Sequence, residues 1–314
     1  MGVHNLDEGY WLYMFFVVSG YLVSKSKITS IGDLISKSIG RFLRLALPIL
    51  FSYLVIYVIY LTLGFHAVET NTLFQCAWYQ GYYTGEYTIY DVLLAPIYVI
   101  LYGSSLLNGP YWCLRMMFIS SLFIFILKFI FNKINTKSES LVFSILMIIT
   151  LSSYVISPII TACLVGMLVS YYESSEKTCY AFLLLWVIML NYVFPRELKA
   201  TLFFAALIVF VPRINIVAMV LSSKPFQFLG KLSWGIYSFH WPIICSFGAL
   251  FIIGLSQNIG LIQSYIVSFG FVIILTFLFA TCFYFTLERF SSFFTRKVTR
   301  RLLQLMNGIS RTNS

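Results

Sequence analysis

Charged residues are scarce in this sequence. Only 10% of the 314 residues are Asp, Glu, Lys or Arg, whereas 60% are hydrophobic, and the mean hydropathy is +0.89. A typical soluble domain carries about 25% charged residues because its surface faces water. The composition therefore excludes a soluble globular domain and indicates a membrane protein.

The patterns of metal sites and disulfide frameworks are also missing. The chain has three histidines and six cysteines, no two cysteines are spaced as Cys-x-x-Cys, and most of them lie in apolar runs. Buried free thiols are the usual state of such cysteines, so we predict neither a metal site nor a disulfide framework. Residues 1–9 also lack the basic start of a secretory signal peptide.

Long apolar runs are what the sequence does contain. A bilayer core about 30 Å thick needs roughly 17–25 apolar residues as a helix. Nine segments are candidate spans, at 10–24, 45–65, 112–131, 141–156, 159–172, 179–194, 200–211, 232–255 and 261–287. A further apolar stretch, 92–107, contains Pro96 and Gly103, and we interpret it as re-entrant or interfacial. The predicted fold class is all-α, a polytopic transmembrane helix bundle of about nine spans plus this segment.

The basic residues indicate how the chain crosses the membrane. The net charge is +10, yet Lys and Arg stand between apolar segments, where they report topology rather than a nucleic-acid partner. If 10–24 runs from outside to inside and the spans alternate, all basic residues except Arg115, Arg196 and Lys199 are cytoplasmic. We predict a multi-pass protein of the cytoplasmic membrane with its N-terminus outside and its C-terminus inside. Residues 1–290 form the membrane domain and 291–314 a basic cytoplasmic tail, in which we expect an interfacial helix over 291–305.

Ionisable side chains at membrane depth are costly, so each is a candidate functional residue. Arg41 and Arg44 stand at the cytoplasmic end of the second span, where they either anchor the helix or bind a phosphate-bearing ligand. His240 lies about 12 Å inside its helix, with Tyr237 one turn earlier on the same face. This histidine is either a hydrogen-bonded structural residue or a functional one. Pro242 has no backbone N–H, so it loosens the helix beside it.

Small residues interrupt the first span near its cytoplasmic end. Ser19 and Gly20 either form a notch for another helix or allow a ligand to approach closely. At the other side of the membrane, Arg115 enters from outside just after Trp112. The distribution suits a cytoplasmic anionic ligand and a separate polar group that faces outward.

Five motifs, in order, resemble those of the membrane acyltransferase 3 family, which modifies cell-surface and secreted glycans. They are FFVVSGYL at 15–22, GRFLRLALP at 40–48, GPYWCLRMMFI at 109–119, LGKLSWGIYSFHWPI at 229–243 and FYFTLERF at 283–290. Each motif alone is weak. Their shared order and approximate spacing make the resemblance strong over residues 1 to 290.

The resemblance implies an integral-membrane O-acyltransferase with a ten-helix domain. Such an enzyme moves an acyl group, usually acetyl, from cytoplasmic acyl-CoA to a hydroxyl of an extracytoplasmic glycan. The implied residues are Arg41 and Arg44 at the acyl-CoA phosphates, Ser19, Gly20, Tyr237 and His240 along the transfer cavity, and Trp112 and Arg115 on the acceptor side. A base must take the hydroxyl proton, and imidazole titrates near operating pH.

The sequence departs from the family pattern in two places. The family's proposed catalytic His lies in a helix upstream of the first motif, and we expect that span upstream of Met1. His4 is the alternative base, although it lies close to the terminus. Met117 stands where the common form of the third motif has Glu.

Two other functions remain open from the sequence. A carrier or flippase-like transporter could use the same polar groups for solute passage without covalent chemistry. An inactive truncated member of the same family would also carry these motifs.

Overall fold

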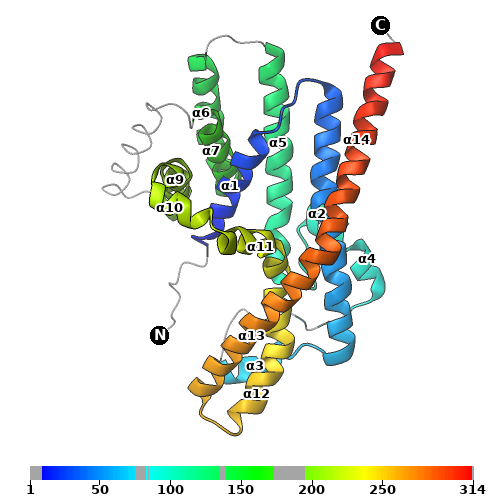
Figure 1. Ribbon diagram of the computed structural model, residues 1–314, viewed down its shortest axis with the longest axis vertical. Helices are drawn as coiled ribbons and strands as arrows, with labels where there is room; N and C mark the ends of the chain where they lie inside the picture. Colours follow the sequence, from blue (N-terminus) through cyan, green and yellow to red (C-terminus); the bar gives the residue numbers. More distant parts are fainter. Residues whose placement is uncertain (1–8, 75–82, 84, 135–138, 173–194, 313–314) are drawn as a thin grey trace. The chain divides into compact units, whose positions relative to one another are not determined.

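The predicted all-α fold is confirmed in the part of the chain that the structure describes (Figure 1). The computed structural model describes residues 9–74, 83, 85–134, 139–172 and 195–312, in which every regular element is a helix. The α-helices are α1 (Leu12–Ser24), α2 (Ile31–Leu63), α3 (Ala67–Phe74), α4 (Ile89–Ile97), α5 (Trp112–Ile134), α6 (Glu139–Ile156), α7 (Pro158–Tyr172), α9 (Arg196–Phe210), α10 (Asn215–Leu221), α11 (Lys224–Ile243), α12 (Ala249–Ser256), α13 (Leu261–Phe283) and α14 (Arg289–Thr312). Three π-helical turns, η2 (Tyr98–Tyr102), η5 (Ile244–Gly248) and η6 (Tyr284–Glu288), and two 3-10 turns, η3 (Gly109–Tyr111) and η4 (Val211–Arg213), complete the set.

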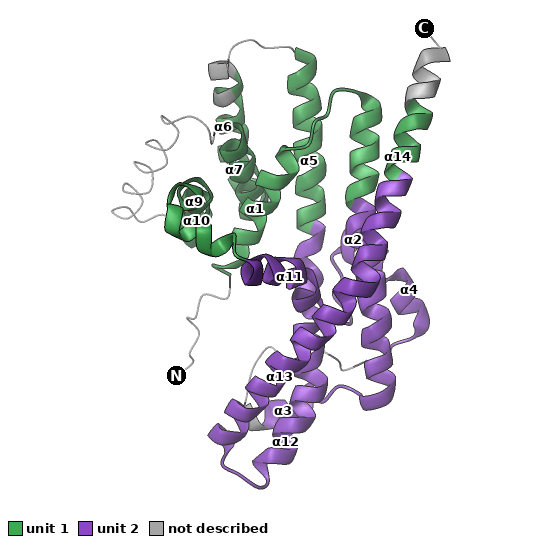
Figure 2. Ribbon diagram, viewed as in Figure 1, with its two compact units in different colours: residues 1–41, 116–223, 299–314 green, residues 42–115, 224–298 purple. Residues whose placement is uncertain are grey.

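The chain divides into two compact units, which Figure 2 distinguishes by colour. Unit 1 comprises residues 1–41, 116–223 and 299–314, and unit 2 comprises 42–115 and 224–298. The division separates the site candidates. Ser19, Gly20 and Arg41 belong to unit 1, whereas the third and fourth motifs meet inside unit 2.

Fewer helices than predicted are long enough to cross a membrane. Among the residues that the structure describes, four helices pass on length and composition: Ile31–Leu63, Gly109–Ile134, Lys224–Ser256 and Leu261–Met306. A fifth is added if Arg196–Arg213 and Asn215–Leu221, bent by 97°, form one span.

The predicted count of nine spans is therefore not confirmed. The predicted spans at 10–24, 141–156 and 159–172 are apolar helices shorter than the roughly 20 residues that cross a 30 Å core. The predicted span at 179–194 lies outside the described residues. Proline separates one pair, because α6 ends at Ile156 and α7 begins at Pro158, where a helix tolerates the missing N–H.

In unit 1, α1 and α7 cross with their backbones in close contact. A Cβ added at Gly20 would overlap the carbonyl of Cys163, and one added at Gly166 would overlap the carbonyl of Val17. Small residues allow such approach between membrane helices, which gain packing energy from it. The carbonyl of Ser24, the last residue of α1, accepts from Lys128 of α5, and that of Ile28, four residues later, accepts from Asn132.

In unit 2, α11 packs closely against α13. A Cβ at Gly235 would lie 2.8 Å from the Cα of Ala280. The turn before α3 is joined to η5, because the backbone N–H of His66 donates to the carbonyl of Cys245 at 2.8 Å.

A helix is present over the predicted segment 291–305, within α14. In unit 1, Ser36 Oγ donates to the carbonyl of Thr299 at 3.1 Å, so this helix packs beside the start of α2. Basic residues occupy its exposed side, among them Arg296, Lys297 and Arg300. An interfacial position of α14 stays a prediction.

The crossing of α1 and α7 generates a test of stability. Gly20→Ala should lower the stability by about 1–3 kcal/mol, because the new methyl group would overpack a backbone contact. The measurement is thermal unfolding of the detergent-solubilised protein, followed by tryptophan fluorescence. The matched control is Gly230→Ala, whose Cβ would meet open space, and which should leave the melting temperature unchanged or raised. Equal melting temperatures for the two variants would contradict the close crossing.

Candidate functional site

Arg41 joins three helices of unit 1 through its guanidinium group. Its Nη2 donates to Ser19 Oγ on α1 at 2.9 Å, and its Nε donates to Ser121 Oγ on α5 at 3.1 Å. Ser121 Oγ in turn donates to the carbonyl of Met117 at 2.6 Å. The structure thus brings together two predicted cofactor-binding residues, Ser19 and Arg41, and gives Arg41 a packing role that its motif did not indicate.

Gly20 and Arg44 lie in different surroundings from Arg41. The space beside Gly20 is filled by the backbone of α7, which favours the packing interpretation of this glycine over ligand approach. Arg44, in unit 2, is exposed on α2. An exposed guanidinium can meet an anion arriving from water.

The third and fourth motifs meet in unit 2 through a group of stacked aromatic rings. Tyr111 stacks on Tyr53 with ring centroids 5.8 Å apart and on Tyr237 with centroids 5.5 Å apart. Tyr237 also lies 5.9 Å from Trp234 and 6.2 Å from His240. These contacts stabilise the packing of the rings, because aromatic pairs at such distances attract one another beyond the effect of burial alone.

Hydrogen bonds fix the third motif to α11. Tyr237 Oη donates to the carbonyl of Pro110 at 2.5 Å, and Cys113 Sγ lies 3.1 Å from the same phenol oxygen. Asn108 Nδ2 donates to the carbonyl of Ser238 at 2.7 Å. The hydroxyl of Tyr237 is therefore committed to holding the segment before α5.

The hydrogen bond from Asn108 replaces one that is missing from α11. In an α-helix the carbonyl of residue 238 accepts from the N–H of residue 242, and Pro242 has no N–H. A buried carbonyl without a donor is costly. Asn108 supplies the missing donor, so the gap that proline opens in α11 is closed from the loop rather than left as a cavity.

His240 is buried to an intermediate degree on α11. Its Nδ1 lies 3.0 Å from the carbonyl of Ile236. Because a carbonyl only accepts, this contact favours the tautomer with hydrogen on Nδ1, which leaves the lone pair on Nε2. His4, the other catalytic candidate, lies outside the described residues.

Trp112 and Arg115, predicted on the acceptor side, both lie at the start of α5. Trp112 is 39% exposed. Arg115 is exposed, its Nη1 donates to the carbonyl of Tyr102 at 3.5 Å, and its Cδ lies beside Gly103, whose φ of 73° is left-handed. The Arg115 side chain therefore stands next to the end of the apolar helix Ile89–Tyr102.

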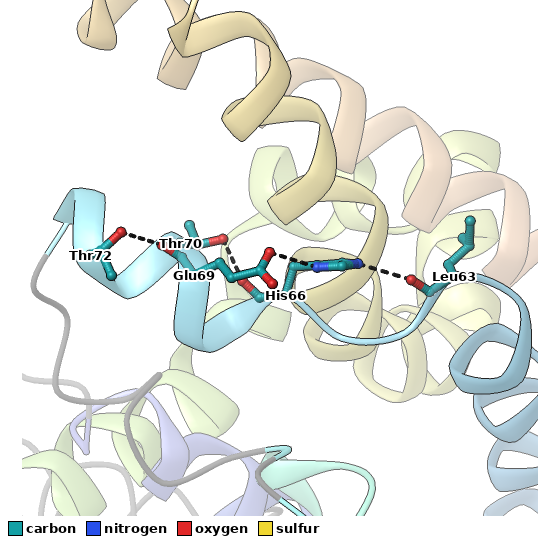
Figure 3. A network of polar contacts seen from close by, with 5 residues as sticks. All are labelled: Leu63, His66, Glu69, Thr70 and Thr72. Atoms are coloured by element: carbon teal, nitrogen blue, oxygen red, sulfur yellow. Dashed lines mark hydrogen bonds and ion pairs between the residues drawn. The ribbon is translucent and has the colours of Figure 1, made fainter.

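Several polar residues that the sequence analysis missed also emerge in unit 2. Tyr53, Asn108 and Ser238 are almost fully buried around Tyr111. His66 lies between Glu69 and the carbonyl of Leu63, at 2.8 and 2.9 Å, and closes the turn from α2 to α3 (Figure 3). In the sequence, the contact between His66 and Glu69 is signalled only by a histidine three residues before an acidic residue.

Among the described residues, no group of three or more metal-ligating side chains occurs.

Comparison with known families adds one match. The sequence model of a family described as an acyltransferase domain, the acyltransferase 3 family, matches residues 8–285. The matched range contains the first four motifs and the start of the fifth. No curated protein and no solved structure matches the chain.

The pairing of Asn108 with Ser238 can be tested by a double-mutant cycle. Asn108→Ala should destabilise the protein by about 1–3 kcal/mol, because it leaves the Ser238 carbonyl buried without a donor. In a Pro242→Ala background the helix regains its own N–H at residue 242, so the same substitution should cost clearly less. Thermal unfolding of the four proteins measures this coupling. Equal losses in both backgrounds would show that Asn108 does not replace the missing donor.

Proposed function

The chain belongs to the acyltransferase 3 family, and we propose that it moves an acyl group, specifically acetyl, from cytoplasmic acyl-CoA to a hydroxyl of an extracytoplasmic glycan. The family match carries this proposal. The contacts of motif residues support it, because Ser19 meets Arg41 in unit 1 and Pro110 meets Tyr237 in unit 2. The acceptor is proposed to be a cell-surface glycan or an exopolysaccharide.

The reaction needs a base and a site for the donor's leaving group. The acceptor oxygen attacks the thioester carbonyl, a C–O bond forms and the C–S bond breaks. The hydroxyl proton passes to a base and then to the departing CoA sulfur. Nε2 of His240 is our candidate base, because the contact of Nδ1 with Ile236 leaves the lone pair there.

The donor and acceptor are assigned to different residues. Arg44 is exposed and is proposed to bind the phosphates of acyl-CoA, since a guanidinium offers bidentate hydrogen bonds to phosphate. Within unit 1, Arg41 holds α1 to α5 through Ser19 and Ser121, and it is proposed to contact the donor as well. Trp112 and Arg115 are proposed to face the acceptor.

The proposal is tested by following labelled acetyl groups. Cell membranes that contain the full chain are incubated with acetyl-CoA labelled in the acetyl group, and label is counted in the purified cell-surface glycan. Base-labile label above that of membranes without the chain supports O-acetyl transfer. Correctly inserted protein without any transfer or thioester cleavage would contradict the proposal and favour a carrier.

Arg44→Ala should weaken the use of acetyl-CoA. Loss of charge-assisted hydrogen bonds to phosphate costs about 1.5–3 kcal/mol, so KM for acetyl-CoA should rise roughly tenfold or more. The control Arg300→Ala removes the same charge from the exposed side of α14 and should leave KM unchanged. Arg41→Ala is a poorer test because it also breaks the contacts with Ser19 and Ser121. An unchanged KM in Arg44→Ala would assign this residue to helix anchoring.

A further inference from the structure

Of the polar atoms in unit 2 that are buried without a hydrogen-bond partner among the described residues, three lie around one ring, that of Tyr111. They are Tyr53 Oη, Asn108 Oδ1 and Ser238 Oγ, and their residues are 1%, 0% and 0% exposed. Buried polar side chains in native proteins are almost always paired, so each exception needs an explanation. Three exceptions in one place indicate a missing partner.

The three atoms gather around the ring of Tyr111. Tyr53 stacks on that ring, and the side chains of Asn108 and Ser238 lie beside its hydroxyl without a well-directed hydrogen bond. The hydroxyl itself pairs with Ser52 Oγ at 2.8 Å. The backbone of residues 107 and 108 lies beside Tyr53.

The chemistry of the three atoms defines what could join them. Asn108 donates an amide hydrogen from Nδ2 to the Ser238 carbonyl. Its Oδ1 carries no hydrogen, and it can therefore only accept a hydrogen bond. The hydroxyls of Tyr53 and Ser238 can each donate or accept. None of the five side chains that gather here, Ser52, Tyr53, Asn108, Tyr111 and Ser238, is charged. A phosphate or carboxylate would therefore be poorly held, whereas a neutral O–H group would satisfy the acceptor and both hydroxyls.

The backbone beside these three atoms also favours a polar ligand. Residues 104–108 are not helical, and they reach α11 at Ser238, well inside the span Lys224–Ser256. Irregular backbone at membrane depth is tolerated where protein buries it or where it lines a hydrated path. A polar ligand that arrives along this segment would meet the three atoms.

We propose that Tyr53, Asn108 and Ser238 bind a hydroxyl group of the acyl acceptor. This inference rests on the proposed function and names the residues that recognise one of its substrates. It places acceptor recognition on neutral hydrogen bonds, separate from the cationic recognition of the donor.

The experiment uses Tyr53→Phe, Ser238→Ala and the double variant of the full chain in membranes. These substitutions remove atoms that make no well-directed hydrogen bond, and they leave in place the pairs Tyr111–Ser52 and Asn108–Ser238 carbonyl. With acetyl-CoA as donor, kcat/KM for the glycan acceptor should fall at least fivefold, while KM for acetyl-CoA stays within twofold. The controls are Tyr57→Phe, one turn along α2, and Ser246→Ala, a buried serine that already pairs with the Pro242 carbonyl at 2.7 Å.

A binding measurement keeps the site testable if no transfer is found. Thermal unfolding of the solubilised protein is followed with methyl glucoside as a neutral hydroxyl probe and with sulfate as an anionic one. Methyl glucoside should stabilise the parent protein more than the double variant, and sulfate should not distinguish them. Absent transfer by the parent protein would defeat the proposed function alone, whereas equal responses to methyl glucoside would defeat this site.

Ligand-free stability separates the remaining outcomes. If the three atoms bind nothing, removal of the two hydroxyls relieves an unsatisfied burial, so the variants should melt higher with unchanged acceptor kinetics. If they hold only a resident water, the variants should melt lower, again with unchanged acceptor kinetics. Either result would overturn the proposal.

Discussion

A proline in α11 sets the arrangement of unit 2. Pro242 deprives the Ser238 carbonyl of its helical donor, and Asn108 replaces that donor from the segment before α5. Tyr237, the residue before Ser238, holds the next part of that segment through the Pro110 carbonyl. The aromatic stack of Tyr53 and Tyr111 then packs against the fixed segment. Backbone that cannot be paired within its own helix must be paired by a neighbour, and this requirement brings two distant motifs together.

Packing accounts for much of what the family motifs do in this chain. Gly20 and Gly166 allow two helices to touch through their backbones, and Ser19 accepts a hydrogen bond from Arg41. The resemblance implies that Ser19, Gly20 and Arg41 contact a ligand, while the residues themselves left a packing notch and helix anchoring open. A site that transfers a reactive group needs rigid walls, since its groups must hold their positions to within fractions of an ångström. The same residues can therefore recur in a family because they shape a site without touching a ligand.

The fold class predicted from the sequence is confirmed, whereas the roles of the predicted site residues stay predictions. Composition alone indicated a membrane protein, because a chain with 10% charged residues cannot cover a surface that faces water. The motifs predicted that Tyr237 and His240 matter, and Pro242 was read as a point of weakness. That Asn108 repairs this weakness could not be predicted, because the pairing joins residues 130 positions apart. The burial of Tyr53 and Ser238 depends on the same long-range contact. Span counting from apolar runs was less successful, because several of those runs fold as helices too short to cross a bilayer.

The three π-helical turns of unit 2 change how its helices should be compared between relatives. Each π turn accommodates one residue more than an α-helix would over the same rise. The faces before and after η5 or η6 are therefore rotated by roughly 100° from the register that a continuous α-helix would keep. A deletion of one residue within such a turn would restore α-helical winding and leave the remainder of the helix facing the same neighbours. Alignments that place gaps only in loops would misassign the faces of α12 and α14, whereas a single gap inside the helix would preserve them.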